Sequence, residues 1–110
     1  MINVIPIQFG ERIALGISVT LPKTNLVMVT TEKGYIMCGA LDVGLLNEKL
    51  ASRGIIAGRA VGVKTLDELL AAPLESTTLK AQELGIVPGT VGRDAITLLL
   101  ELDETQHPAP

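Results

Sequence analysis

The residues of this chain that could do chemistry are few, and the first of them is its only cysteine, Cys38. Gly39 and Ala40 lead from Cys38 to Asp42, which we expect to cap a helix. The dipole of such a helix can acidify a nearby thiol, although the Asp42 carboxylate opposes thiolate formation. Two interpretations of Cys38 follow. It is either a small buried hydrophobic residue, or the nucleophile or redox thiol of an enzyme, with positive charge supplied by Arg59 or Lys33.

Arg59 is the second candidate. In the strand expected around it, it shares a face with apolar residues only. A guanidinium keeps its charge, and an unpaired buried ion is costly, so this side chain needs an acceptor. A salt bridge to Asp42 or Glu48, or an outward reach to water, would provide one. The alternative is a small anionic ligand, such as a carboxylate or phosphate, bound by Arg59 together with Cys38, Gly39 and Asp42.

Other chemistry lacks its parts in this sequence. The only histidine is His107, near the C-terminus, so a histidine general base, a Ser-His-Asp or Cys-His arrangement and a multi-histidine metal site are not expected. Residues 58–65 resemble a phosphate-binding loop, but Val63 stands where that loop needs glycine before Lys64. Acidic residues form no cluster at strand ends, so we expect no metal site, and the sequence identifies no cofactor.

The elements that must position these residues are predicted from hydrophobic periodicity. Apolar residues alternate with a period of two over residues 5–9 and 13–21, Val and Thr are frequent over residues 25–31, and a fourth segment follows the turn at residues 32–34 and covers residues 35–38. Short turns separate these four segments, which predicts an antiparallel meander of four strands. Pro6 has no N–H to donate and therefore suits a strand at the edge of the sheet.

After Asp42 the period changes to that of helices. We predict, in order, a helix from Asp42 to Arg53-Gly54, a strand over residues 55–63, a helix that begins with the capping pair Thr65 and Glu68 and stops before Pro73, a helix over residues 76–84, and a helix over residues 94–102. Residues 94–102 are also compatible with a strand, but we favour the helix. Gly54, Gly58 and Gly62 are an even number of residues apart, so they would share one face of the fifth strand and allow close packing.

Composition predicts one domain with an aliphatic core. The chain has 110 residues, 47% of them hydrophobic and 19% charged, and only Phe9 and Tyr35 are aromatic. We expect a single domain over residues 1–102 and a loose tail over residues 103–110. The net charge of -3 and the scattered basic residues argue against nucleic acid as a partner. No apolar stretch approaches the roughly 20 residues that span a membrane. The lone cysteine and the absence of a signal-peptide pattern predict a cytoplasmic protein.

The predicted fold is α+β: an antiparallel meander of about four strands plus a fifth strand after the first helix, covered by helices on one side. One face of this sheet stays uncovered, and so many aliphatic residues would leave it apolar. We therefore predict a homo-oligomer, a dimer or trimer. Two functional classes remain: a homo-oligomeric binding or interaction module, with a small anionic ligand at Arg59, and an enzyme that uses Cys38. The absence of a partner histidine favours the first.

Three segments also resemble a known family. They are KTNLVMVTTEKGYIMCGALDVGLLNEKL, AGRAVGVKTLDELL and ELGIVPGTVGRDAI, which together span most of residues 21–96. They resemble the YunC-like family of small prokaryotic proteins, a domain-of-unknown-function family, and KGYIMCGALD is the most specific part. The resemblance implies a compact α+β domain and an ordinary cytoplasmic role, and it assigns no activity or site residue. Such proteins often have a methionine after the Pro-Gly pair where this chain has Thr90.

Overall fold

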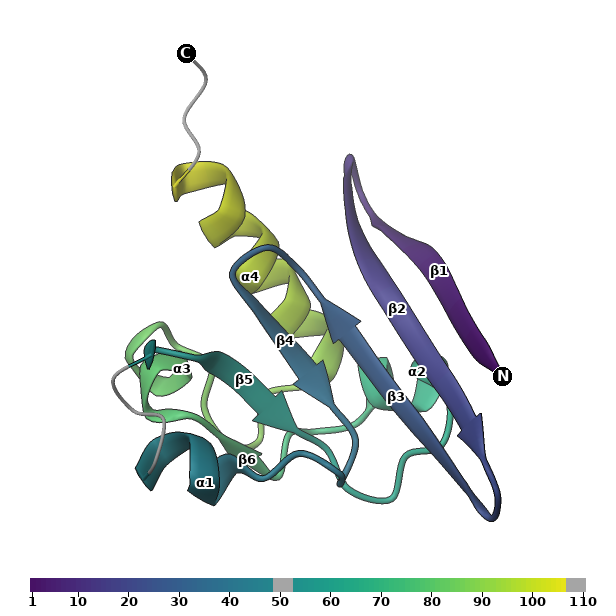
Figure 1. Cartoon of the computed structure of the whole chain (residues 1–110). Helices are drawn as coiled ribbons and strands as arrows, with labels where there is room; N and C mark the ends of the chain where they lie inside the picture. The colour runs from purple at the N-terminus through teal and green to yellow at the C-terminus, as the bar shows by residue number, and fades with distance from the viewer. Residues whose placement is uncertain (49–52, 107–110) are drawn as a thin grey trace.

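The computed structural model describes residues 1–48 and 53–106 and contains one six-stranded sheet with helices packed against it (Figure 1). The strands are β1 (Ile2–Phe9), β2 (Arg12–Leu21), β3 (Thr24–Thr30), β4 (Gly34–Met37), β5 (Ile56–Arg59) and β6 (Ser76–Thr77). The helices are α1 (Val43–Glu48), α2 (Leu66–Ala71), α3 (Leu79–Glu83) and α4 (Gly92–Gln106).

The strands lie in the sheet in the order in which they follow along the chain. All neighbouring pairs are antiparallel except β4 and β5, which are parallel. A parallel pair needs a crossover connection, and here the connection contains α1. The predictions of an α+β fold, a four-stranded antiparallel meander and a further strand after the first helix are therefore confirmed.

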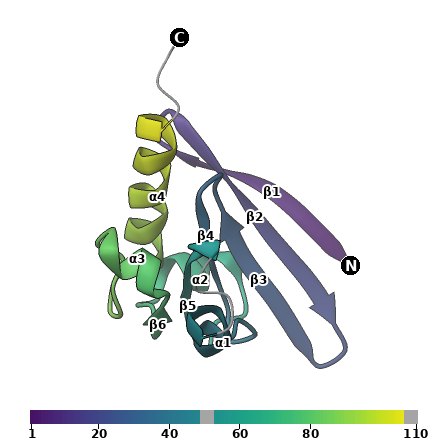
Figure 2. The same ribbon diagram turned by 60° about the vertical axis from the view of Figure 1, so that its left-hand side comes forward.

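Helices cover one face of the sheet. In α4, Ala95, Ile96, Leu99 and Leu100 are buried at helical spacing. This stripe packs over β4 and β2, α2 packs over β3 and β2, and α3 packs against β5 (Figures 1 and 2). The short helix α1 lies instead at the β5 end, in front of the sheet in Figure 1. The front face of β1 to β4 therefore carries no helix among the described residues.

The register of the strands decides which side chains belong to each face. Val29 pairs with Ile36 and with Gly16, and all three are buried on the helix side. Their neighbours along each strand point to the opposite face because side chains alternate in a strand. We call that opposite side of β1 to β4 the open face. Its residues are Ile2, Val4, Pro6, Gln8, Ile13, Leu15, Ile17, Val19, Leu21, Thr24, Leu26, Met28, Thr30, Tyr35 and Met37.

Strand β1 is one edge of the sheet, and its hydrogen-bond pattern explains Pro6. Met1 exchanges backbone hydrogen bonds with Thr20, at 2.8 and 3.2 Å, so the odd-numbered residues of β1 point their backbone groups at β2. Pro6 is even-numbered and faces away from the sheet, where its missing N–H breaks no pairing. The prediction that Pro6 occupies an edge strand is thus confirmed.

The fifth strand is shorter than predicted. It covers Ile56–Arg59 rather than residues 55–63, because Gly54 and Gly62 have φ angles of +61° and +78°, which lie outside the strand region. The predicted glycine face is therefore reduced to Gly58. A Cβ at Gly58 would lie 2.6 Å from Cδ1 of the buried Leu74, so this single glycine does allow close packing over the strand.

The segment predicted as a helix over residues 76–84 begins instead with a strand. Ser76 and Thr77 pair with Arg59 and Gly58 as β6, and α3 starts only after Thr78. The Thr78 hydroxyl oxygen caps α3 by accepting the backbone N–H of Ala81 at 3.3 Å. Two residues are too few to show the period-two pattern of a strand in the sequence. The pairing with β5 is what makes this segment a strand.

The other helix predictions agree more closely with the structure. Asp42 caps α1 and Thr65 caps α2, as predicted: the side-chain oxygens accept the N–H groups of Leu45 at 2.9 Å and Glu68 at 3.1 Å. Residues 49–52 of the first predicted helix lie outside the described residues, and Gly54 at its predicted end has a φ angle of +61°. Residues 94–102 are helical, as favoured, and α4 continues through Gln106, so the expected loose tail does not begin at Asp103. Residues 107–110 are not described. In the described part of the chain, no helix is long and apolar enough to cross a membrane.

Candidate functional site

Cys38 lies in the core, directly after β4. Its backbone N–H donates to the carbonyl oxygen of Val27 at 3.0 Å, and the residue is only 5% exposed. Met37 is the register partner of Arg59, so alternation turns Cys38 to the opposite side of the sheet, beside Ile36 in the hydrophobic core. The structure therefore separates the thiol from the guanidinium. It fits the interpretation of Cys38 as a small buried hydrophobic residue.

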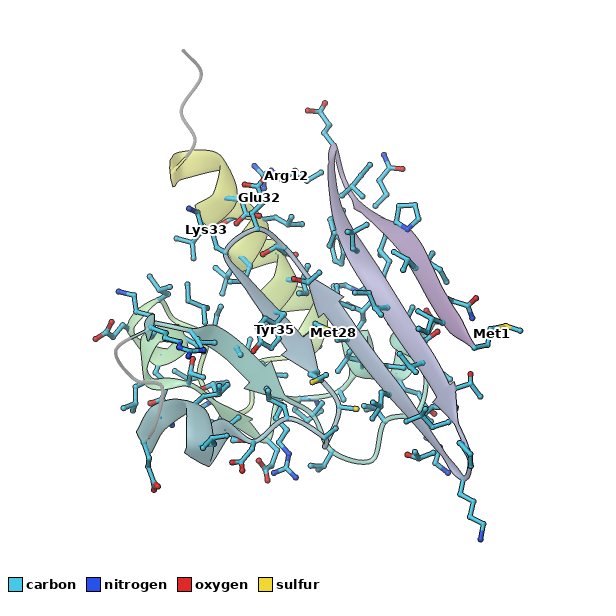
Figure 3. All side chains as sticks on the ribbon, viewed as in Figure 1. Met1, Arg12, Met28, Glu32, Lys33 and Tyr35 are labelled. Atoms are coloured by element: carbon cyan, nitrogen blue, oxygen red, sulfur yellow. The ribbon has the colours of Figure 1, made fainter. Side chains whose placement is uncertain are left out.

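Lys33, the other cation considered for a cysteine enzyme, is equally far from the thiol. It precedes β4 whereas Cys38 follows it, and Figure 3 shows Lys33 in the turn between β3 and β4. Five residues of extended chain separate the two positions, which corresponds to about 16 Å. Lys33 therefore does not contact the Cys38 thiol.

The Arg59 guanidinium is paired with an acceptor, but this acceptor is neither Asp42 nor Glu48. Its Nη1 donates to the Glu75 carboxylate at 3.3 Å, and its Nε donates to the carbonyl oxygen of Gly39 at 3.3 Å. The prediction of a salt bridge to Asp42 or Glu48 was wrong. Glu75 lies beside β5 because its backbone N–H donates to the carbonyl oxygen of Arg59 at 2.7 Å, and this contact follows from the β5–β6 pairing that the sequence did not reveal.

The Arg59–Glu75 pair is close to the surface. The two side chains are 32% and 45% exposed, so water screens their attraction. Such pairs contribute roughly 0–1 kcal/mol to stability. The bridge therefore orients Arg59 more than it stabilises the fold.

Three of the four predicted site residues meet at one polar pocket of about 570 Å³, the Arg59 pocket. It lies between β5, β6, α1 and the segment that precedes α1. Its lining residues are Gly39, Ala40, Leu41, Asp42, Val43, Gly44, Asn47, Arg59, Ser76, Thr77, Gln82 and Pro88. The pocket thus brings together Gly39, Asp42 and Arg59, which the sequence analysis placed in one candidate site, whereas Cys38 does not line the pocket.

Several polar groups of this pocket already hold the protein together. Asp42 caps α1, the Asn47 amide oxygen accepts the N–H of Leu79 at 2.9 Å, and the Gln82 amide donates to the carbonyl oxygen of Thr77 at 3.1 Å. Arg59 is the only charged group of the lining besides Asp42. An anion that entered the pocket would therefore meet the guanidinium first and would compete with Glu75 for it.

The open face is a second feature of the surface, and it contains none of the candidate site residues. Ile2, Val4, Ile13, Leu15 and Leu21 are 69%, 58%, 59%, 45% and 41% exposed, and six further apolar side chains of this face are partly exposed. Figure 3 shows two of these six, Met28 and Tyr35, on the neighbouring strands β3 and β4. Sequence periodicity predicted an uncovered apolar face but not which residues form it, because strand order and register were needed.

The described residues contain no group of three or more His, Cys, Asp or Glu side chains close enough to hold a metal ion. The chain is thus a small α+β domain with a mixed sheet, a polar pocket around an arginine and an apolar sheet face.

Comparison with known proteins gives this domain a family. Residues 37–99 match the family described as "Domain of unknown function (DUF1805)". The chain is 54% identical over 101 residues to "Uncharacterized protein YunC" of Bacillus subtilis (strain 168). This match covers 92% of this chain and 100% of the relative. The protein therefore belongs to the YunC-like DUF1805 family, as the three sequence segments predicted.

A solved structure agrees with the fold. The crystal structure of a protein of unknown function from Thermoplasma acidophilum is 35% identical, with a TM-score of 0.78 over 88% of this chain and 91% of that chain. The family and both of these similar proteins are described as uncharacterised or of unknown function, so the geometry of the protein is the basis for its function.

Proposed function

We propose that this protein is a homo-oligomeric binding module whose copies associate through the open face of β1 to β4. The observation that carries the proposal is the exposure of aliphatic side chains on adjacent strands of one sheet face. Soluble monomers rarely expose a large contiguous apolar patch, and such patches mark interaction sites. Its exposed area is on the order of several hundred Å², comparable to the roughly 800 Å² that each partner contributes to a standard interface.

The chemistry of the open face favours a second copy as the occupant. Over β1 to β4, which the structure describes in full, no open-face position carries a charged side chain. The face can therefore meet its own copy without repulsion between like charges. Two-fold packing of one face on another is self-complementary and closes as a dimer. A trimer would need two different patches, so the dimer is the preferred state.

Strand addition at the edge is a weaker route to assembly. Strand β1 offers outward-facing backbone groups at its even-numbered residues, but Pro6 interrupts them because it has no N–H. The apolar face has no such interruption. The proposal therefore commits to packing between faces.

The experiment is light scattering coupled to gel filtration at micromolar protein concentration. The wild type is expected to elute with the mass of a dimer, and Val4→Glu with the mass of a monomer, because it places a charge in the interface. Leu79→Glu is the matched control: Leu79 is 57% exposed, almost as much as Val4, but lies on α3. A monomeric wild type, or a Val4→Glu variant that stays dimeric, contradicts the proposal.

The second candidate function is the binding of a small anion in the Arg59 pocket. It is supported by the partly exposed guanidinium, which faces a pocket large enough for a metabolite. Because the Glu75 carboxylate is paired with the Arg59 guanidinium in the free protein, an anion must displace Glu75 in order to bind there. Glu75→Gln is therefore expected to tighten the binding of phosphate or citrate, and Arg59→Ala to abolish it.

A thermal-shift titration with these two anions tests the second candidate, since a ligand bound only by the native state raises Tm. Lys80→Ala is the control, because Lys80 also pairs with a glutamate, Glu83, but lies outside the pocket. Equal anion-induced shifts in the wild type, Arg59→Ala and Lys80→Ala would refute binding at Arg59.

The alternative of an enzyme that uses Cys38 has no supporting geometry. The thiol is buried in the core, and both proposed cations lie away from it. The proposal also keeps the cytoplasmic location, which is supported by a single cysteine that has no second cysteine to pair with.

A further inference from the structure

A second cavity lies at the other end of the sheet, far from Arg59 along the strands. The pairing between β2 and β3 ends at Leu15 and Thr30, whereas β2 starts at Arg12, so residues 12–14 extend beyond β3. Figure 1 shows the tip of the β1–β2 hairpin standing apart from the β3–β4 turn, with α4 behind that turn. The cavity between these three elements has a volume of about 810 Å³, within the usual range for small-molecule sites.

We call it the hairpin cavity. Its lining residues are Phe9, Gly10, Glu11, Arg12, Ile13, Leu15, Thr30, Thr31, Glu32, Leu100 and Asp103. One part of the wall is apolar and consists of Phe9, Ile13, Leu15 and Leu100. Phe9 is one of only two aromatic residues in the chain. The guanidinium of Arg93 lies 5.8 Å from the centre of its ring, so this ring already accepts a cation.

The charged part of the wall is predominantly acidic. Glu11, Glu32 and Asp103 stand against one cation, Arg12, and Figure 3 shows Arg12 and Glu32 close together above the β3–β4 turn. Carboxylates that share a cavity with a low-dielectric wall attract cations and repel anions. The charged lining of this cavity therefore differs from that of the Arg59 pocket, where one arginine lies with one aspartate.

Asp103 is the carboxylate whose contacts suggest a ligand. Its Oδ2 accepts the backbone N–H of Glu32 at 3.0 Å, which fixes the group between α4 and the β3–β4 turn. Its Oδ1 is shielded from water and has no hydrogen-bond partner among the described residues. A desolvated carboxylate oxygen without a donor costs free energy, so unmatched groups of this kind call for an explanation. A donor brought by a ligand would remove the cost.

We propose that the hairpin cavity binds a small organic cation: a primary ammonium group attached to an apolar body. The ammonium would donate to Asp103 after a neighbouring side chain of the wall shifts, and the apolar body would cover Phe9 and Leu100, which do not belong to the open face. An anionic ligand is disfavoured by the three carboxylates. A neutral apolar ligand would leave Oδ1 of Asp103 without a donor. This proposal rests on different residues from the anion site, so each can fail alone.

The test is a titration of the full-length, isotopically labelled protein with hexylamine, monitored by amide chemical shifts. Hexanol and hexanoate are matched ligands with the same chain and no positive charge. We expect hexylamine to bind, with shifts confined to the hairpin tip, the β3–β4 turn and the end of α4. The two matched ligands should bind at least roughly tenfold more weakly, since a charge-assisted hydrogen bond is lost.

Two variants locate the site. Asp103→Asn keeps an oxygen that can accept the Glu32 N–H, so the fold is expected to survive, while hexylamine affinity should fall roughly tenfold. Glu101→Gln is the matched control, because Glu101 lies exposed on the same helix outside the cavity, and its affinity should be unchanged. The proposal is overturned by no binding at about 10 mM hexylamine, by equal affinity for hexanol, by unchanged affinity in Asp103→Asn, or by shifts centred elsewhere.

Discussion

Replacing Gly92 with alanine is expected to destabilise this protein, although the same change usually stabilises a helix. Gly92 is the first residue of α4, and its backbone N–H donates to the carbonyl oxygen of Ala72 at 2.9 Å. A Cβ at this position would collide with the carbonyl oxygen of Leu69 and lie 3.2 Å from Cα of Leu70. Both are backbone atoms of α2, so a side-chain rotation cannot relieve the contact, and the two helices would have to separate.

The magnitude follows from two opposing effects. Alanine is favoured over glycine in a helix by up to about 1 kcal/mol. Forcing an extra carbon into a packed core costs about 1–3 kcal/mol, and a contact with backbone belongs near the upper end. The net loss is therefore about 1–2 kcal/mol, which lowers Tm by roughly 4–10 °C in a domain of this size.

The assay is urea unfolding followed by circular dichroism, at one protein concentration because self-association shifts apparent stability. The matched control is Gly44→Ala in α1, where a Cβ would meet only the Asp42 Oδ1 atom at an ordinary 3.4 Å. That variant should be as stable as the wild type or slightly more stable. If Gly92→Ala matched or exceeded the wild type, the close approach of α2 and α4 described above would be wrong.

Three further predictions concern particular contacts. Thr65→Ala should lower the free energy of unfolding by about 1 kcal/mol, measured in urea, because it removes the cap of α2; an unchanged value would mean that the cap is dispensable. A double-mutant cycle with Arg59→Ala and Glu75→Ala should give a coupling energy below about 1 kcal/mol, and a value several-fold larger would contradict a solvent-screened pair. Cys38 should react with a maleimide far more slowly in the native protein than in urea, since the thiol is buried; equal rates would place it at the surface.

Much of the fold could be predicted because its main signals are local. The period-two alternation of β1 to β4 and the side-chain caps at Asp42 and Thr65 lie within a few residues of the elements that they define. The exceptions depend on distant parts of the chain. Ser76 and Thr77 form a strand only because β5 is there to pair with them. The end of α4 carries few apolar residues, so its pattern fades before the helix does.

The candidate site shows the same division. Proximity in the sequence was enough to place Gly39 and Asp42 in one pocket, and parallel pairing of β4 with β5 brought Arg59 to them. The partner of Arg59 was missed because Glu75 reaches it through the β5–β6 pairing. The burial of Cys38 was one of the two interpretations drawn from the sequence, and the alternation of the strand accounts for it, since Cys38 shares the face of Ile36 while Tyr35 and Met37 point away.

Pro6 has a further consequence for how far assembly can grow. A sheet with an uninterrupted edge can recruit strand after strand from other molecules and so extend into fibres. Here an incoming strand would find a missing donor in the middle of β1, on the only side from which it could approach. Growth in that direction is therefore blocked, and in the proposed face-to-face dimer the stacking of sheets would end with the second molecule. A proline at the rim and an apolar surface beside it together favour a finite complex over an aggregate.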